Sequence, residues 1–168
     1  SGTGSNGDVL SHVISVAHFL TNSSISRVVG DYTIVHKERA DSQAAGQTKI
    51  VDNDDMVAAL IHFENGVKGH IGASRVTWGR KCGLRWELHG TEGTIMYDQE
   101  RLNELKLFTR QDNPATDGFR TILTGPLHEP YAAFLPNGGH SLGYMDVKIC
   151  ELHDPVSYTH LTLPTKPR

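Results

Sequence analysis

Apolar residues near the start of the chain recur with the spacing of an amphipathic α-helix. Those that share one helical face are Val9, Leu10, Val13, Ile14, Val16, Ala17 and Leu20. The pattern predicts a helix that begins near Asp8 and buries this face. A polar stripe runs beside it, made of Asp8, Ser11, His12 and Ser15. A carboxylate and an imidazole one turn apart can share a proton or a substrate hydroxyl.

Most of the remaining chain shows the composition and alternation that are typical of β-strands. The segments expected to be strands are 26–39, 57–63, 67–73, 84–88, 95–97, 104–109 and 119–124. Loops are expected at 40–48, 89–94 and 112–117, where Gly, Pro and small polar residues gather. A final helix is expected to start near Ser141, with Met145, Ile149 and Leu152 at i, i+4 and i+7 and Pro155 ending it.

The turn at Asn65-Gly66 predicts the register of a hairpin. A two-residue loop would place Phe63 opposite a lysine and mix the two faces. A three-residue loop places Phe63 opposite Val67 and Ile61 opposite a glycine, which keeps apolar residues opposite apolar or small ones. We therefore expect the longer loop, with Gly66 in the left-handed conformation.

The order of these elements predicts an α+β fold. We expect a mostly antiparallel, open β-sheet with helices packed on one face, as in a two-layer sandwich. The other face of the sheet carries Ala58, Leu60 and Gly72, and we expect it to be available to a second subunit.

Composition narrows the possible functions. The chain has 168 residues, of which 38% are hydrophobic and 21% charged, and this is ordinary for a soluble domain. A net charge of -3 gives no basic surface for nucleic acid, and no apolar run approaches the ~20 residues that span a bilayer. We therefore expect a cytoplasmic protein without nucleic-acid or membrane partners. Cys82 and Cys150 form no CxxC motif and are expected to be free thiols.

Known catalytic and metal-binding motifs are few. None of the ten histidines shows the spacing of a zinc site, so we predict no metal. No G-x-S-x-G motif supports a serine hydrolase. Residues 2–7 spell G-x-G-x-x-G and Asp31 follows, but no strand precedes them, so we reject a complete dinucleotide site here. Ser5-Asn6-Gly7-Asp8 also fits a capping box, in which Asp8 would only satisfy amides at the helix start.

Three motifs resemble the substrate domain of the Gfo/Idh/MocA oxidoreductases. They are Gly-Asp-x-x-x-His at 7–12, Leu-His-Gly-Thr-Glu-Gly-Thr-Ile at 88–95, and Gly-His-Ser-Leu-Gly-Tyr at 139–144. The resemblance implies hydride transfer between NAD or NADP and a carbinol of a sugar, inositol or related polyol. It implies that His12 accepts the hydroxyl proton, while Asp8 either orients His12 or binds a neighbouring hydroxyl. Leu10 and Ser15 stand where relatives often have Gly and Asp.

Six further residues are expected to contact the substrate: Ser15, Trp78, Arg80, Lys81, His140 and Tyr144. Arg80 or Lys81 would hydrogen-bond substrate hydroxyls or a carboxylate, although the segment 78–83 also fits an exposed turn between strands. His140 either faces the substrate or caps local backbone groups, and both interpretations stay open. Cofactor-binding residues are unknown.

The resemblance also predicts the domain organisation. Residues 1–154 would form part of a C-terminal substrate domain, truncated at both ends, with the N-terminal Rossmann domain absent. Residues 155–168 change character abruptly and are expected to be a non-native tail, the alternative being a short strand at 158–163. We expect the chain alone to be inactive and the parent to oligomerise through the sheet. The alternative is a non-catalytic relative that serves as a polyol-binding or oligomerisation module.

Overall fold

The computed structural model describes residues 3–110 and 114–153. The chain divides into two compact units, Ser1–Arg80 and Lys81–Arg168, and each unit contains its own antiparallel sheet. All strand pairs in the described residues are antiparallel. The predicted α+β class with open antiparallel sheets is therefore confirmed. The tail at 155–168 lies outside the described residues.

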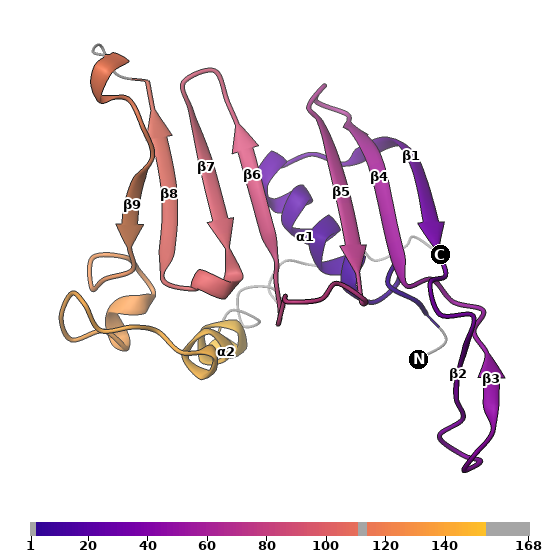
Figure 1. Ribbon diagram of the computed structural model, residues 1–168. Helices are drawn as coiled ribbons and strands as arrows, with labels where there is room; N and C mark the ends of the chain where they lie inside the picture. Colours follow the sequence, from indigo (N-terminus) through magenta and orange to yellow (C-terminus); the bar gives the residue numbers. More distant parts are fainter. Residues whose placement is uncertain (1–2, 111–113, 154–168) are drawn as a thin grey trace, which may run out of the picture. The chain divides into compact units, whose positions relative to one another are not determined.

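In the first unit, one helix covers one face of a three-stranded sheet. The helix α1 spans Val9–Thr21, and the strands β1 (Ile25–Thr33), β4 (Met56–Phe63) and β5 (Lys68–Ser74) pair in the order β1-β4-β5. Figure 1 shows α1 behind this sheet; most of its contacts with the sheet are with β5, and His18 packs edge-on against Phe63 of β4. The buried residues of this layer are Leu10, Ala59, Ile61 and Phe63.

The predicted register of the β4–β5 hairpin is confirmed. The backbone N–H of Phe63 donates to Val67 O at 2.8 Å, and Ile61 lies opposite Gly69. Gly66 has a φ of 88°, which is the left-handed conformation that the three-residue loop requires. Alternation along β4 therefore sends Ile61 and Phe63 toward the buried face, and Leu60 toward the exposed one.

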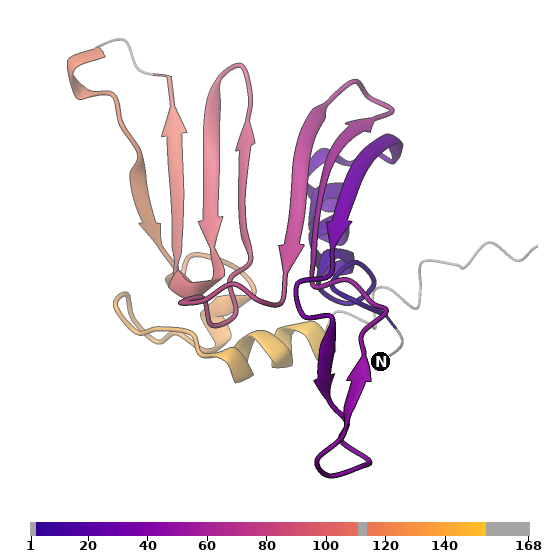
Figure 2. The ribbon, with the colours of Figure 1, turned by 45° about the vertical axis from the view of Figure 1, so that its right-hand side comes forward.

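The prediction of one long strand at 26–39 is wrong. The chain leaves β1 after Thr33 and re-enters a two-stranded ribbon, β2 (Glu38–Ala40) with β3 (Thr48–Ile50), which extends from the sheet in Figure 2. The buried carboxylate of Asp55 causes the break, because it accepts hydrogen bonds from Val35 N at 2.9 Å and His36 N at 3.0 Å. These amides are thereby withdrawn from the strand ladder. The ribbon is also held by an ion pair between Arg39 and Asp55.

The second unit contains the four-stranded sheet β6-β7-β8-β9. Its strands are β6 (Arg85–His89), β7 (Gly93–Asp98), β8 (Glu104–Thr109) and β9 (Arg120–Leu123), all close to the predicted positions. Short 3-10 turns η1, η2 and η3 span Gln99–Arg101, Pro114–Thr116 and Tyr131–Ala133. Part of the loop predicted at 112–117, residues 112 and 113, lies outside the described residues.

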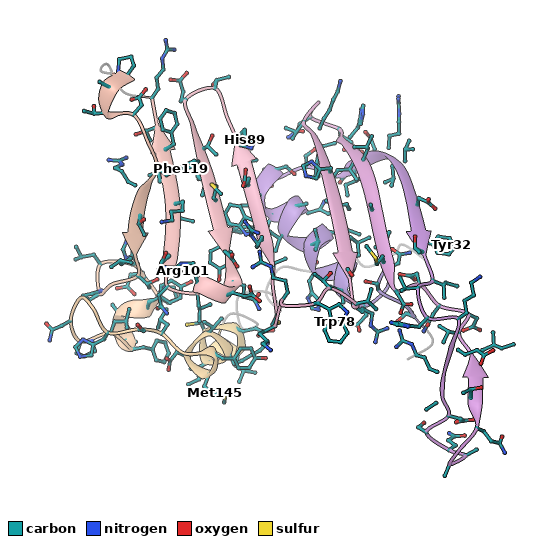
Figure 3. All side chains as sticks on the ribbon, in the orientation of Figure 1. Tyr32, Trp78, His89, Arg101, Phe119 and Met145 are labelled. Carbon is teal, nitrogen blue, oxygen red and sulfur yellow. The ribbon has the colours of Figure 1, made fainter. Side chains whose placement is uncertain are left out.

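The last helix forms where it was predicted. It is α2, Tyr144–His153, and begins three residues after Ser141. The apolar stripe of Met145, Ile149 and Leu152 is exposed, at 68%, 51% and 75%. Figure 3 shows Met145 on the outer side of α2. The half-buried positions of the helix include Val147 and Cys150, so a different face packs.

The helix α1 follows its predicted pattern more closely. Leu10 is buried, and the other members of the predicted apolar stripe are half-buried. The cysteines Cys82 and Cys150 are free thiols, as predicted. In the part of the chain that the structure describes, neither helix has the length and apolar character needed to cross a membrane.

Candidate functional site

The segment before α1 is fixed to the start of β4. The backbone N–H of Ser5 donates to Asp54 O at 2.9 Å, and that of Asn6 donates to Asp54 Oδ2 at 2.7 Å. Asp8 N donates to Gly4 O at 3.2 Å, and Leu10 N donates to Ser5 O at 2.9 Å. The first turn of the helix is therefore tied to the sheet through Asp54.

Gly4 is required by this close approach. A Cβ atom at Gly4 would lie 2.5 Å from the backbone O of Asp54, which is much closer than real Cβ contacts. The glycines at 2–7 were rejected above as a dinucleotide fingerprint, and the structure gives Gly4 a packing role. The amides of Ser5 and Asn6, which a phosphate would need, donate to Asp54 instead.

The proposed catalytic pair lies on the exposed side of α1. Asp8 is the N-cap residue, with helical φ and ψ, yet its side chain makes no capping hydrogen bond. In a capping box, Ser5 Oγ would accept from Asp8 N and the Asp8 carboxylate would accept from Ser5 N. Instead Ser5 Oγ has no hydrogen-bond partner among the described residues and Ser5 N donates to Asp54 O, so the capping-box interpretation is wrong. Asp8 and His12 are both exposed and one helical turn apart, which places their Cβ atoms about 5–6 Å from each other. The carboxylate and the imidazole thus face solvent together.

The other polar residues of α1 extend the same surface. Ser11 Oγ donates to Asp8 O at 2.6 Å, so this hydroxyl serves the helix backbone. Ser15 is exposed and lies one turn beyond His12. Helical spacing therefore places Asp8, His12 and Ser15 along one exposed side of α1, which is the side that the sequence pattern predicts.

Trp78 belongs to the same end of the first unit. The end of β5 meets the start of β4, because Ser74 pairs with Met56 and Arg75 N donates to Asp55 O at 3.0 Å. Trp78 follows Arg75 by three residues, a span of at most ~11 Å. Its indole is 98% exposed and extends beyond the end of β5 in Figure 3. Arg80 is also exposed and is the last residue of this unit.

Three predicted site residues lie in the second unit. The backbone N–H of Lys81 donates to Glu100 Oε1 at 2.7 Å, while the residue remains exposed. His140 is exposed, and its Nδ1 lies 3.2 Å from Asn137 O. Tyr144 begins α2, is 67% exposed, and its ring centroid lies 5.6 Å from Lys148 Nζ. His140 and Tyr144 thus flank the entry to α2.

Sequence reasoning missed the residues that hold these surfaces in place. Asn103 bonds to the backbone of Leu142, and Asp54 and Asp55 bond to segments that are far from them in sequence. Each side chain acts on backbone groups 19 to 48 positions away. The only sequence signal was the type of residue, a short amide or carboxylate next to a strand end.

Two hollows on the surface of the described residues are lined by none of the predicted site residues. One of about 410 Å³ lies at the far end of α1, beside His18 and Glu64. Another of about 180 Å³ lies on the second sheet, where Arg85 pairs with Asp98 at 3.3 Å. Among residues 3–110 and 114–153, no group of three His, Cys, Asp or Glu side chains is arranged to hold a metal ion.

Comparison with known families finds one match. The family model described as GFO/IDH/MocA C-terminal domain matches residues 1–96. A curated relative, levoglucosan dehydrogenase of Pseudarthrobacter phenanthrenivorans, is 35% identical over 165 residues. That alignment covers 92% of this chain and 42% of the relative. The chain therefore spans about two fifths of the length of this relative.

Solved structures give the same result. An NAD binding oxidoreductase from Klebsiella pneumoniae is 38% identical with a TM-score of 0.85, and the match covers 99% of this chain and 44% of the other. A levoglucosan dehydrogenase in complex with NADH and levoglucosan is 37% identical with a TM-score of 0.81. This second match covers 90% of this chain and 40% of the other.

Proposed function

The chain belongs to the Gfo/Idh/MocA family through its C-terminal domain, and on that basis we propose that it forms the sugar-binding half of an NAD-dependent dehydrogenase. The substrate class is a sugar or related polyol with an oxidisable carbinol, and levoglucosan is the first candidate. The proposal rests on relatives that are named levoglucosan dehydrogenase and on one solved with NADH and levoglucosan.

One observation carries the assignment of roles within this chain. The carboxylate of Asp8 makes no capping hydrogen bond although it occupies the N-cap, and it is exposed next to the imidazole of His12. A helix start normally uses such a carboxylate for its own amides. An acid left exposed one turn from a histidine is a suitable partner for proton transfer.

In the proposed mechanism His12 acts as the general base. Its neutral imidazole accepts the proton of the carbinol hydroxyl as the C–H bond of the same carbon is broken. Asp8 orients the ring and stabilises the imidazolium that forms, as an orienting carboxylate does for other catalytic histidines. His12 lies on α1 and Asp8 is the N-cap of the same helix, which limits the loss of their alignment.

The hydride acceptor would be held outside this chain. NAD supplies that acceptor when bound, and its pyrophosphate needs backbone N–H groups at a helix start. In this chain the amides of Ser5 and Asn6 donate to Asp54, so this segment does not fit a pyrophosphate. We therefore assign the sugar side of the reaction to this chain, and we expect the chain alone to be inactive.

The remaining predicted residues are proposed as sugar contacts. Trp78 offers an exposed ring against which an apolar sugar face can stack, and Ser15 offers a hydroxyl beside His12. The cations of Arg80 and Lys81 would donate to sugar oxygens. His140 and Tyr144 would bind further hydroxyls from the start of α2, and this is the binding role proposed for both.

Formation of NADH by the full-length protein that carries this chain tests the proposal. We expect absorbance of NADH to rise when NAD is mixed with levoglucosan or another sugar, and the rate to fall when Asp8 is replaced in Asp8→Asn. If no sugar or inositol gives NADH, the enzymatic proposal fails. A rise in melting temperature with sugar but without turnover would favour the non-catalytic polyol-binding module.

We also propose that the exposed face of the first sheet binds a second copy of the protein. Leu60 and Val29 lie directly opposite each other on this face and are 61% and 66% exposed, and Met56 on the same face is 42% exposed. Exposed apolar side chains that share one face of a sheet are typical of an interaction surface.

Sedimentation velocity of the full-length protein tests this interface. Leu60→Glu should shift the assembly toward smaller species, because a buried unpaired carboxylate is costly. Leu127→Glu is the matched control, since Leu127 is 94% exposed and lies in the other unit. Equal sedimentation of the wild type and Leu60→Glu would refute this interface.

A further inference from the structure

The side-chain amide of Asn103 holds both backbone groups of Leu142. Asn103 Nδ2 donates to Leu142 O at 3.0 Å, and Leu142 N donates to Asn103 Oδ1 at 2.7 Å. The two residues are 39 positions apart, and the pair is partly buried. An amide that both donates to and accepts from one residue fixes the position and the orientation of that residue.

Asn103 is itself firmly placed. It lies between the 3-10 turn η1 and strand β8. Its backbone O accepts hydrogen bonds from Thr124 N at 2.9 Å and from Thr124 Oγ1 at 3.2 Å. The clamp on Leu142 is therefore anchored to the edge of the four-stranded sheet, where β8 pairs with β9.

Leu142 lies midway between the two proposed sugar contacts of this unit. His140 precedes it by two residues and Tyr144 follows it by two. The Leu142 side chain is only 6% exposed, so packing and the clamp act on the same residue. The next residue is also fixed, because Gly143 N donates to Asp146 Oδ2 at 2.8 Å at the start of α2.

The contact of His140 with its own turn determines what the ring can offer. Its Nδ1 lies 3.2 Å from Asn137 O. A carbonyl oxygen only accepts, so Nδ1 carries the hydrogen in this contact. In the neutral ring, Nε2 is then an acceptor, which suits a sugar hydroxyl as donor.

We propose that Asn103 is a positioning residue for the sugar: it holds Leu142 so that His140 Nε2 and the Tyr144 hydroxyl stay in place for binding. This inference rests on the proposed function, because it acts through two residues that are assigned there to sugar binding. Asn103 itself does not contact the substrate.

The test compares Asn103→Leu with Asn65→Leu in the full-length protein. Asn65 is a matched control, because its Nδ2 donates to Thr21 O at 3.0 Å and its Oδ1 accepts from Val67 N at 3.2 Å, in the other unit. Asn103→Leu should raise the KM for levoglucosan about tenfold or more, as expected for the loss of well-placed hydrogen bonds. The kcat and the KM for NAD should change by less than about twofold, because only sugar binding is weakened.

A second substitution separates the clamp from simple filling of space. Asn103→Asp keeps the shape and the acceptor for Leu142 N, but it places an oxygen against Leu142 O where the amide donated. We expect its KM for levoglucosan to rise as in Asn103→Leu. A wild-type KM in both variants, or an equal loss in Asn65→Leu, would overturn the inference.

Two further measurements keep this inference distinct from the proposed function. His140→Ala must itself raise the KM for levoglucosan. If Asn103→Leu raises this KM but His140→Ala leaves it unchanged, Asn103 does not act through His140 and the inference is overturned. If the wild type oxidises no sugar, the proposed function fails, and this inference falls with it as a claim about sugar. Amide hydrogen exchange still tests the clamp: residues 139–143 should exchange about tenfold faster in Asn103→Leu than in Asn65→Leu. Equal exchange would overturn the clamp as well.

Discussion

Substitution of Gly4 by alanine tests how the start of α1 is positioned. The added Cβ would lie 2.5 Å from the backbone O of Asp54, and neither group can rotate away. The segment must therefore move, which strains the hydrogen bonds from Ser5 N and Asn6 N to Asp54. Because Gly4 O accepts from Asp8 N, the displacement also reaches the proposed catalytic pair.

The size of the effect follows from these contacts. Overpacking of a tight site costs about 1–3 kcal/mol, and each weakened hydrogen bond adds about 0.5–1.5 kcal/mol. We therefore expect Gly4→Ala to lower the free energy of unfolding by about 2–6 kcal/mol and the Tm by about 4 °C or more. A shift of Asp8 and His12 by about 1 Å would reduce the turnover rate by about 10²-fold.

Thermal unfolding followed by circular dichroism and NADH formation with levoglucosan measure the two effects in the full-length protein. Gly118→Ala is the control, since a Cβ there meets no atom within 4 Å and should leave both measurements unchanged. If Gly4→Ala unfolds and turns over like the wild type, the close approach to Asp54 does not position α1.

Three other predictions concern the first unit. Hydrogen bonds from the backbone N–H of His36 and then of Val35, together with the charge of Arg39, lower the pKa of Asp55 despite its burial. The ionised Asp55 therefore stabilises the fold above the unfolded carboxyl pKa, near 3.9, and this stabilisation is lost as the pH falls below that value. Acid unfolding curves of Asp55→Asn should consequently depend less on pH in this range than those of the wild type. Ile61→Ala should cost about 2–5 kcal/mol in urea unfolding, because Ile61 is 2% exposed; a loss below 1 kcal/mol would contradict its place in the core. Gly66→Ala should cost about 1–2 kcal/mol through its φ of 88°, whereas an unchanged midpoint would argue against the three-residue loop.

The features that could be predicted from the sequence are those set by local spacing. The register of the β4–β5 hairpin follows from which side chains share a face, and Gly66 marks its turn. The shared side of Asp8 and His12 follows in the same way from helical periodicity, and both are exposed on α1. Such features need no knowledge of distant residues.

The features that could not be predicted depend on contacts between distant residues. The strand predicted at 26–39 is interrupted because Asp55 binds the amides of Val35 and His36, twenty and nineteen positions away. The helix α2 begins after the clamp of Asn103 on Leu142, a contact between residues 39 positions apart. Periodicity alone identified an apolar stripe on α2 but not the face that packs.

The candidate site shows the same division. Trp78 lies at the end of the sheet where α1 begins. Two sets of contacts place it there: Ser74 pairs with Met56, and Asp54 accepts hydrogen bonds from the segment before α1. The sequence showed only that Trp78 lies in a turn. A tertiary pairing, not a motif, brings these elements to one end of the unit.

The central claim is that His12 accepts the substrate proton, and a single-turnover measurement tests it most directly. The full-length protein with saturating levoglucosan and NAD is compared with His12→Ala, and with His18→Ala as a control on the same helix, where His18 packs edge-on against Phe63. We expect the rate of NADH formation to fall by about 10²–10⁴-fold in His12→Ala only, with levoglucosan binding retained. A wild-type rate in His12→Ala would contradict the proposal.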